Sequence, residues 1–286
     1  MFNFAPYMDY GCDILLAGTM GDIGAAVKDS LESHGLSVVI MDFPQNVFRD
    51  EFGYSRKLMK SIAEFRPRVI FPIGNSLALS RYKPKMPEGI TAPVDCEENI
   101  RLLDSKVSAS RLAASLGILQ PRMYDSPEDI GEGQVVFKRD VSFGGMGVHL
   151  PWNRKSLDNL IAHQRIGEPY LIEDFIEGED YSIDCIRWDG EFVSGCYRVL
   201  QQHGRGPSTE REKCDFPELA SIARTMLDHI DYRGICGMDF RVDAKGKAYF
   251  LECNPRFTGG VGTQIQSGFD LPWLLYKFAL GLPFNF

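Results

Sequence analysis

The 286-residue sequence lacks several features that would each indicate a particular class of protein. Its seven cysteines lie far apart and none has CxxC spacing, so neither a structural zinc site nor a disulfide framework is predicted. Basic residues are outnumbered: 31 Lys and Arg against 39 Asp and Glu give a net charge of −8, which argues against a nucleic-acid partner. No apolar run approaches the roughly 18 residues of a membrane span, and no basic leader precedes the first apolar run. We therefore expect a cytoplasmic protein with reduced thiols and no membrane partner.

The first ninety residues alternate between short apolar runs and helical stripes. The alternation predicts three strands, at residues 13–17, 37–41 and 69–71. Between them it predicts two helices, which end at Gly35 and Phe65. Strands that alternate with helices in this way are typical of a parallel, doubly wound sheet.

A glycine-rich turn, Gly18–Gly24, follows the first predicted strand, and Asp42 ends the second. This combination is similar to a dinucleotide-binding fingerprint, but its spacing is GxxGxxG rather than GxGxxG. Strand-to-helix turns need glycine for steric reasons whether or not they bind phosphate. We therefore favour a structural or substrate-facing turn, with NAD binding as the alternative. A Walker A motif is absent from the sequence.

Three prolines between residues 83 and 93 indicate a connector, and a well-specified helix follows it. Asp104 or Ser105 caps this helix, and Gly117 ends it. Lys106 lies in its first turn, where a positive charge opposes the helix dipole. Two interpretations are open: an exposed surface lysine, or a ligand for a phosphate bound beside the helix N-terminus.

A predicted strand at residues 135–138 ends in Lys138, and a glycine-rich loop separates it from a second strand at 148–150. Ser142, Gly144 and Gly145 belong to this loop. Backbone N–H groups of glycine can approach phosphate oxygens closely because no Cβ intervenes, and Lys138 adds a point charge. The predicted hairpin is either a lid over phosphates or a mobile hairpin tip.

Acidic residues surround an apolar pair, Phe175 and Ile176, after a predicted strand at residues 170–174. A nucleobase needs an apolar slot with a few polar groups, including an acceptor for its exocyclic amine. Glu173 is the candidate acceptor, and an acid a few residues further on is a candidate for the ribose hydroxyls. A solvated acidic turn is the alternative.

Two alternating segments, 237–242 and 249–254, are joined by a short turn and predict a β-hairpin. We expect Lys245 and Gly246 to form a two-residue loop, a register that a longer loop would shift. One face of this hairpin is then apolar, and it comprises Met238, Phe240, Val242, Tyr249, Leu251 and Cys253.

The other face of the predicted hairpin is polar. The register places Asp239 directly opposite Glu252, with Cβ atoms ~5 Å apart, and Asn254 points to the same side. Opposed carboxylates repel unless a cation neutralises them, and Mg²⁺ takes one or two carboxylates plus substrate phosphates. Arg256 follows directly and suits a phosphoryl oxygen or a carboxylate. The alternative is a solvent-facing polar side of a sheet.

Taken in order, these segments resemble the motifs of the ATP-grasp superfamily, and the local texture is most similar to its carbamoyl-phosphate-synthase-like and amino-acid-ligase branches. The matching segments are Asp104–Lys106, Lys138 with Ser142–Gly147, Glu173–Gly178, Gly237–Phe240 and Leu251–Arg256. The resemblance implies an α/β protein with an ATP-grasp domain at 94–286, in which two α+β subdomains clasp ATP. It also implies a lid subdomain at about 118–174 and a Rossmann-like pre-ATP-grasp domain at 1–93.

The resemblance further implies which residues bind ATP and metal. The phosphates are assigned to Lys106, Lys138, Ser142, Gly144 and Gly145, the adenine to Glu173 and the backbone of Phe175 and Ile176, and the ribose to Asp180. Two Mg²⁺ ions, or Mn²⁺ in their place, are assigned to Asp239, Glu252 and Asn254, with Glu252 bridging the two ions.

Three residues are implied to be catalytic. Arg256 matches a family arginine that stabilises the transferred phosphoryl group, and Lys138 contacts the same phosphates. A basic residue of the stretch 197–208 reaches the phosphates or the acid substrate in relatives, and the candidates here are Arg198 and Arg205.

The implied activity is that of an ADP-forming ligase, in which a carboxylate is activated as an acyl phosphate and captured by an amine. The expected partners are a small-molecule carboxylate, such as an amino acid, and an amine. Few residues follow Asn254, so we expect a homodimer or a partner subunit to complete the acceptor side. The alternatives are an ATP-dependent kinase of a small carboxylate, a nucleotide-binding regulatory protein without turnover, and an NAD-dependent oxidoreductase.

Overall fold

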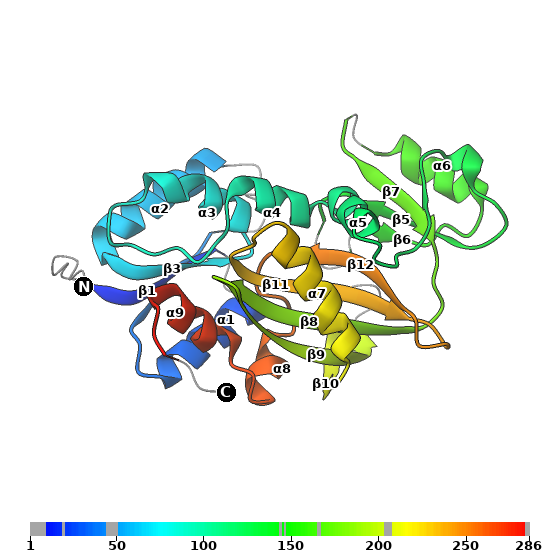
Figure 1. Ribbon diagram of the computed structural model, residues 1–286. Coiled ribbons are helices and arrows are strands. Elements are labelled where there is room, and N and C mark those ends of the chain that lie inside the picture. Colours follow the sequence, from blue (N-terminus) through cyan, green and yellow to red (C-terminus); the bar gives the residue numbers. More distant parts are fainter. Residues whose placement is uncertain are drawn as a thin grey trace.

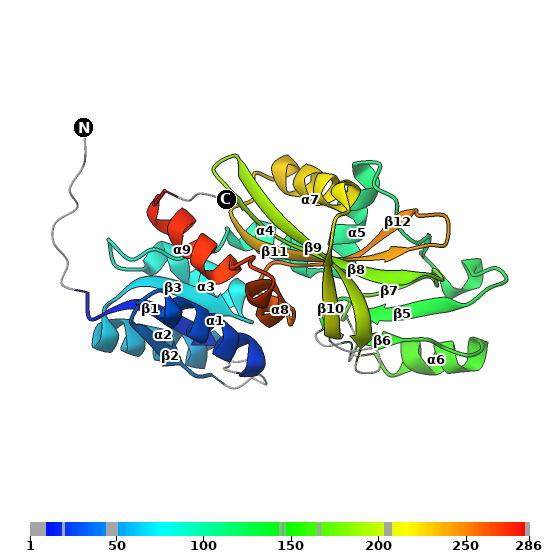
Figure 2. The ribbon, with the colours of Figure 1, turned by 90° about the horizontal axis from the view of Figure 1, so that it is seen from below.

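Three β-sheets form the framework of the protein in the computed structural model (Figure 1). A parallel sheet lies at one end, a four-stranded sheet at the other, and a five-stranded sheet between them (Figure 2). The structure describes residues 10–18, 21–43, 51–142, 145, 147–164, 167–202 and 208–283. Within this part of the chain, no helix combines the length and the apolar character needed to cross a membrane.

The N-terminal sheet has the order β2-β1-β3, and its strands are β1 (Cys12–Gly18), β2 (Val38–Met41) and β3 (Pro67–Ile73). All its pairings are parallel, which confirms the alternation that the sequence predicted. The helices of this region are α1 (Gly21–Ser33), α2 (Glu51–Phe65), α3 (Ser76–Tyr82) and the 3₁₀ helix η2 (Lys83–Lys85). Val27 and Leu31 of α1 are fully buried, as expected for one apolar face of a helix.

Gly18 explains the glycine-rich turn sterically. Its φ is +149°, and a Cβ there would lie 2.0 Å from the carbonyl oxygen of Ile73 on β3. Only glycine accommodates both this backbone angle and this close approach. The structural interpretation of the turn is thus supported at Gly18, whereas residues 19 and 20 lie outside the described part of the chain.

The C-terminal helices pack on the N-terminal sheet. Helices α8 (Val261–Gln266) and α9 (Leu271–Leu280) lie against α1 (Figure 2). One hydrophobic cluster joins Leu16 and Phe71 of this sheet to Leu275 of α9. The expected boundary at residue 93 therefore does not separate two hydrophobic cores, and the division into a pre-ATP-grasp domain and an ATP-grasp domain stays a prediction.

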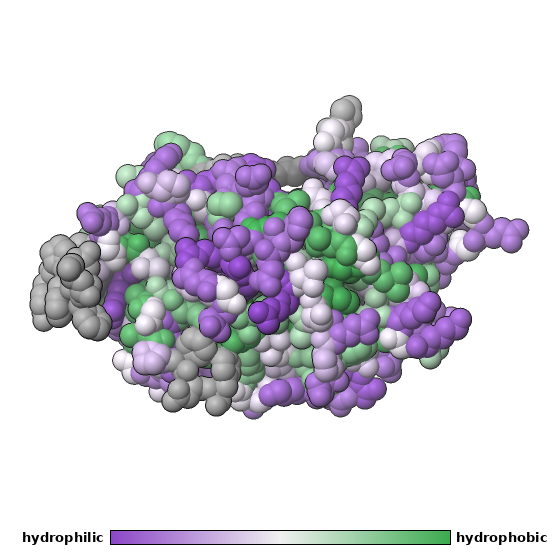
Figure 3. All heavy atoms as spheres, viewed as in Figure 1, coloured by the Kyte–Doolittle hydropathy of each residue, from purple (hydrophilic) through white to green (hydrophobic). Residues whose placement is uncertain are grey.

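The central sheet is antiparallel and has the order β10-β9-β8-β11-β12. Its strands are β8 (Glu179–Trp188), β9 (Glu191–Gln202), β10 (Ser208–Cys214), β11 (Gly234–Val242) and β12 (Ala248–Asn254). The helices α4 (Glu97–Asp104), α5 (Lys106–Ser115) and α7 (Pro217–His229) contact it. Helix α7 is amphipathic: it buries Leu219 and Met226, and hydrophilic side chains cover its outer face (Figure 3).

The β11–β12 hairpin has the predicted register where it matters for the site, because Asp239 pairs with Glu252. The expected two-residue turn is wrong: the backbone N–H of Asp243 donates to Lys247 O at 3.0 Å, so the loop is longer. A register shift beside Asp239 leaves Leu251 as an extra residue and restores the predicted pairing. As a consequence, Phe250 and Ala248 lie on the apolar face, in place of the expected Leu251 and Tyr249.

The third sheet forms the lid and has the order β4-β7-β5-β6. Its strands are β4 (Met123–Tyr124), β5 (Val135–Arg139), β6 (Val148–His149) and β7 (Tyr170–Asp174), accompanied by α6 (Arg154–Ala162) and the 3₁₀ helix η3 (Pro127–Asp129). A separate small core holds it together, with Phe137, Leu157 and Ile172 at its centre. Pairing of β5 with β6 confirms the predicted hairpin. Gly144 lies outside the described residues.

Candidate active site

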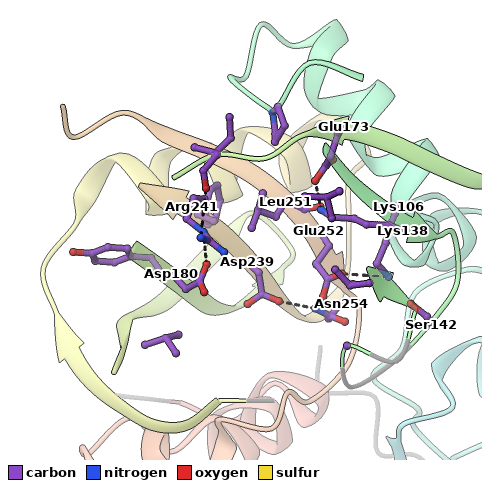
Figure 4. A pocket seen from close by; sticks show the side chains of 18 of the residues that line it. Lys106, Lys138, Ser142, Glu173, Asp180, Asp239, Arg241, Leu251, Glu252 and Asn254 are labelled. Atoms are coloured by element: carbon purple, nitrogen blue, oxygen red, sulfur yellow. Dashed lines mark hydrogen bonds and ion pairs between the residues drawn. The ribbon is translucent and has the colours of Figure 1, made fainter. Parts of the chain in front are cut away.

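A cleft of about 280 Å³ lies between the lid and the central sheet. Its walls come from the lid strands, α5 and β8 to β12, so segments far apart in the sequence meet there (Figure 4). Of the predicted site residues, those that line it are Lys106, Lys138, Ser142, Gly145, Glu173, Phe175, Ile176, Asp180, Asp239, Glu252, Asn254 and Arg256. The structure thus brings nearly all of the described candidates together, although their individual roles stay predictions.

Lys106 begins α5 and is buried, with only 5% of its surface exposed. Its Nζ lies 3.2 Å from Glu252 Oε2, which rules out the exposed surface lysine. The N-terminus of α5 is capped by Ser105 and by Asp140, whose Oδ1 accepts a hydrogen bond from Val107 N at 2.9 Å. A carboxylate therefore occupies the place beside the helix N-terminus, and the lysine itself points into the cleft.

Lys138 and Glu173 form a buried ion pair across the lid sheet, with Nζ 2.5 Å from Oε1. Lys138 also donates to the backbone oxygen of Leu251 at 3.4 Å, which ties the lid to β12. Burial raises the pKa of Glu173, and Lys138 opposes that shift. Glu173 is 2% exposed, so it does not belong to a solvated acidic turn. An adenine amine would have to share this carboxylate with Lys138.

The polar face of the hairpin concentrates negative charge. Asn254 Nδ2 donates to Asp239 Oδ2 at 3.3 Å and to Glu252 Oε1 at 3.5 Å. Burial and then the charge of Glu252 raise the pKa of Asp239 to about 7. Burial by itself raises the pKa of Glu252, but Lys106 and Lys138 more than offset this, so its pKa is lowered. The pair therefore resists a second negative charge.

The donor set at this face fits a hard cation. Asp239 and Glu252 supply carboxylate oxygens, and Asn254 supplies an amide oxygen after rotation of its amide group. In the described part of the chain, no three His, Cys, Asp or Glu side chains converge into an all-protein metal cage. Magnesium suits such an incomplete set because it is usually held by one or two carboxylates together with substrate phosphates.

The two predicted arginines lie in different places. Arg256 lines the cleft, and its Nη2 donates to Asn254 Oδ1 at 2.7 Å. Arg198 of β9 does not line the cleft: its Nε donates to Glu212 at 2.7 Å, and its Nη1 lies 3.5 Å from Glu179. The expectation that Arg198 reaches the reacting groups is therefore wrong in this structure. Arg205 lies outside the described residues.

Arg211 is a cleft residue that the sequence analysis missed. Its side chain is 8% exposed, and its Nη1 donates to Ser182 Oγ at 3.0 Å and lies 3.6 Å from Asp184 Oδ2. Asp184 also accepts a hydrogen bond from Thr258 Oγ1 at 2.8 Å. Burial raises the pKa of Asp184, and Arg211 opposes the shift. A Cβ on Gly260 would lie 2.2 Å from Arg211 Nη1, so a larger residue there would displace the guanidinium.

A simple reason explains why Arg211 was missed. Its strand reads Thr-Glu-Arg-Glu-Lys, and every residue in that run is polar. A period-two pattern reveals which side faces inward only when apolar residues mark one face. Arg241, two residues from Asp239 on the same strand, also lines the cleft and was not predicted, although the alternation places both side chains on the polar face.

Comparisons with known proteins agree with the fold. Residues 167–285 match the family described as "ATP-grasp in the biosynthetic pathway with Ter operon". The carbamoyl phosphate synthase large chain of Sulfurisphaera tokodaii is 25% identical over 164 residues, which is 51% of this chain. The chain spans 16% of the length of that relative.

Solved structures show the same architecture at low sequence identity. The biotin carboxylase domain of Hydrogenobacter thermophilus 2-oxoglutarate carboxylase, determined with MgADP and bicarbonate, has a TM-score of 0.75 at 18% identity, covering 98% of this chain and 72% of its own. The Bacillus licheniformis L-amino acid ligase has a TM-score of 0.70 at 17% identity, covering 94% and 74%. The Thermotoga maritima N5-carboxyaminoimidazole ribonucleotide synthetase has a TM-score of 0.66 at 17% identity, covering 96% and 77%.

The lid, the central sheet and the cleft between them define the ATP-grasp fold. The family match at residues 167–285 and the fold of the described chain both agree with the ATP-grasp resemblance that the ordered motifs indicated.

Proposed function

We propose that the protein is an ATP-dependent, ADP-forming ligase that joins a small carboxylic acid to an amine through an acyl phosphate. One observation carries this proposal: cations for phosphates, a donor set for Mg²⁺ and arginines for an acid meet in a single cleft. These groups are Lys106 and Lys138, then Asp239, Glu252 and Asn254, then Arg211 and Arg256. The three structural relatives described above are a biotin carboxylase domain, an L-amino acid ligase and a ribonucleotide synthetase, which supports a ligase-type reaction.

The phosphates of ATP are proposed to bind at the end of the cleft where Lys106 and Lys138 lie. Both lysines are buried and paired with carboxylates, Glu252 and Glu173 respectively. Such pairs hold the ammonium groups at fixed positions before a ligand arrives, so less reorganisation is needed on binding. Mg²⁺ held by Asp239, Glu252 and Asn254 would neutralise charge that develops on the transferred phosphoryl group.

The first chemical step is phosphoryl transfer. A carboxylate oxygen of the substrate attacks the γ-phosphorus of ATP, and the bond from that phosphorus to the β–γ bridging oxygen breaks, releasing ADP. The protein needs no side-chain nucleophile for this step, because phosphoryl transfer depends mainly on positioning and on electrostatic stabilisation. Arg256, whose Nη2 donates to Asn254 Oδ1, is proposed to donate to the transferred group.

The second step forms the amide. The nitrogen of the amine attacks the carbonyl carbon of the acyl phosphate, the carbon–oxygen bond to phosphate breaks, and the amine loses a proton. Arg211 lies in the same cleft, where it donates to Ser182 and pairs with Asp184. It is proposed to bind the carboxylate of the substrate acid. The lid would keep water away from the acyl phosphate, which otherwise hydrolyses.

The proposal is tested by measuring ADP release from Mg-ATP with pools of amino acids and other small carboxylic acids, each supplied with and without amines. We expect release only with the pool that contains the correct acid, and a product whose mass equals acid plus amine minus water. A phosphorylated acid as the final product would instead identify a kinase. ATP binding without release in any pool would favour a regulatory protein, and NADH binding without Mg²⁺ an oxidoreductase.

A further inference from the structure

A short linker, Phe175–Gly178, connects the lid strand β7 to the central strand β8. It is pressed against the end of β11, because a Cβ on Gly178 would lie 2.1 Å from the carbonyl oxygen of Val242. The linker therefore has a fixed position relative to the strand that carries Asp239. Phe175 and Ile176 of the linker line the cleft.

Arg241 on β11 holds this linker from the side. Its Nη1 lies 3.4 Å from Ile176 O and 3.3 Å from Gly178 O, and it donates to both. Its guanidinium carbon lies 5.7 Å from the centre of the Phe175 ring. Its Nε lies 2.6 Å from Asp180 Oδ1, so it pairs with the acid just beyond the linker.

Arg241 also has donors toward the cleft. Its hydrogen bonds to the two linker carbonyls come from Nη1, its Nε faces Asp180, and the side chain lines the cleft and is 23% exposed. A guanidinium has five N–H donors in a rigid fork. When Nε and Nη1 are engaged by the protein, the direction of the remaining Nη2 donors is set in advance. Such a group costs little entropy when it binds a ligand.

Arg241 lies far from the lysines along the cleft. In Figure 4, Arg241 and Asp180 lie at one end, Lys106 and Lys138 at the other, and Asp239 between them. A nucleotide whose phosphates reach Lys106 and whose sugar reaches Asp180 has its nucleoside beside Arg241, which pairs with Asp180. Phosphate binding therefore does not explain an arginine at this position.

We propose that Arg241 is a nucleoside-binding residue. It fixes the linker and Asp180, and it donates from Nη2 to an acceptor on the base or sugar of the bound nucleotide. The inference rests on the proposed binding of ATP in this cleft and adds to it which side chain recognises the nucleoside.

The test compares two ligands that share their phosphate chemistry. Mg-ADP contains the nucleoside, whereas inorganic tripolyphosphate with Mg²⁺ contains only phosphate groups. Titration calorimetry on the full chain should show that Arg241→Met weakens Mg-ADP binding about tenfold. Binding of tripolyphosphate should stay within about twofold of the wild type, because Lys106 and Lys138 are unchanged.

Two further variants complete the test. Arg241→Lys keeps the charge but loses the planar fork, so Mg-ADP binding should be weakened to a similar extent. Arg224→Met is the matched control, because Arg224 is 58% exposed on α7 and does not line the cleft. Both ligands should bind this control as they bind the wild type.

The outcomes separate the two proposals. Equal weakening of the binding of both ligands in Arg241→Met would mean that Arg241 only holds the linker in place. Unchanged Mg-ADP binding would mean that Arg241 contacts no part of the nucleotide. Either result overturns the inference. Should Arg241→Met fail to fold, as judged by its thermal melt, Arg241→Lys decides the matter by the same comparison. If the wild type binds neither ligand, the proposed ATP site fails as well.

Discussion

Asp239 and Glu252 face each other across the β11–β12 hairpin, and the amide of Asn254 donates to both carboxylates. Two facing carboxylates are costly, and here one is paired with Lys106 while the other has its pKa raised to about 7. This arrangement stores electrostatic repulsion that a divalent cation would relieve. Folding brings the carboxyl groups of Asp239 and Glu252 together, and binding of a divalent cation would neutralise their repulsion.

Replacing Glu252 by Gln should lower turnover that depends on Mg²⁺ by about 10³-fold or more, because a carboxylate proposed to bind Mg²⁺ is lost. The two side chains have nearly the same volume, so the variant should still fold, although Lys106 loses its charged partner and the melting temperature falls. ADP release under saturating Mg-ATP measures the first effect. The control is Glu128→Gln, whose carboxylate lies outside the cleft with a 72% exposed side chain. Wild-type turnover in Glu252→Gln would contradict the metal assignment.

The raised pKa of Asp239 should make stability depend on pH in the absence of metal. The unfolded carboxyl loses its proton near its ordinary pKa of 3.8, whereas the folded one keeps it until about pH 7. Stability contributed by this group is therefore lost as pH rises through that interval. Asp239→Asn should consequently raise the melting temperature at pH 8 by about 3–6 °C, and much less at pH 5.

The control for this effect is Asp243→Asn, in the turn of the same hairpin. Backbone N–H groups of Lys247 and Lys245 lower the pKa of Asp243, so its charged form stabilises the fold. This variant should therefore be less stable than the wild type at pH 8, the opposite sign. Thermal melts in EDTA at several pH values test both variants. An Asp239→Asn melt that tracks the wild type at every pH would show that burial at this site carries no electrostatic cost.

Arg211 and Arg198 should differ sharply in their effects on activity. Arg211→Met removes a buried guanidinium that lines the cleft and leaves Asp184 without its cation, so kcat/KM should fall about 100-fold. Arg198→Met removes partly exposed pairs with Glu212 and Glu179, and kcat/KM should stay within about threefold. Steady-state kinetics show which of the two arginines, Arg211 on β10 or Arg198 on β9, contributes to the reaction. A larger loss of kcat/KM in Arg198→Met than in Arg211→Met would restore Arg198 as the catalytic arginine.

Gly178→Ala should destabilise the protein even though only a methyl group is added. The new Cβ would meet Val242 O at 2.1 Å, and neither backbone can move without disturbing the linker or β11. Overpacking of this kind costs about 1–3 kcal/mol, which corresponds to a fall of ~3–10 °C in melting temperature. The matched control is Gly131→Ala in the lid, where a Cβ would have no neighbour within 4 Å. Equal melting temperatures for both variants would show that the linker is not pressed against β11.

The sequence alone determined the features that depend on local periodicity. Alternating runs predicted the parallel N-terminal sheet, and period-two alternation placed Asp239 opposite Glu252. Even there, the turn was longer than expected, and only the extra residue at Leu251 restored the register. Local patterns define which side chains share a face, because strand and helix geometry repeat at fixed periods.

Which faces meet depends on the packing of the whole molecule. The pairing of Lys106 with Glu252, the capping of α5 by Asp140, and the arrival of Arg211 and Arg241 in the cleft join segments far apart in the chain. Nothing periodic within a strand specifies a partner on another sheet. Such contacts depend on how three sheets and their helices pack as whole bodies, and buried charges occupy the places where that packing allows them to be paired.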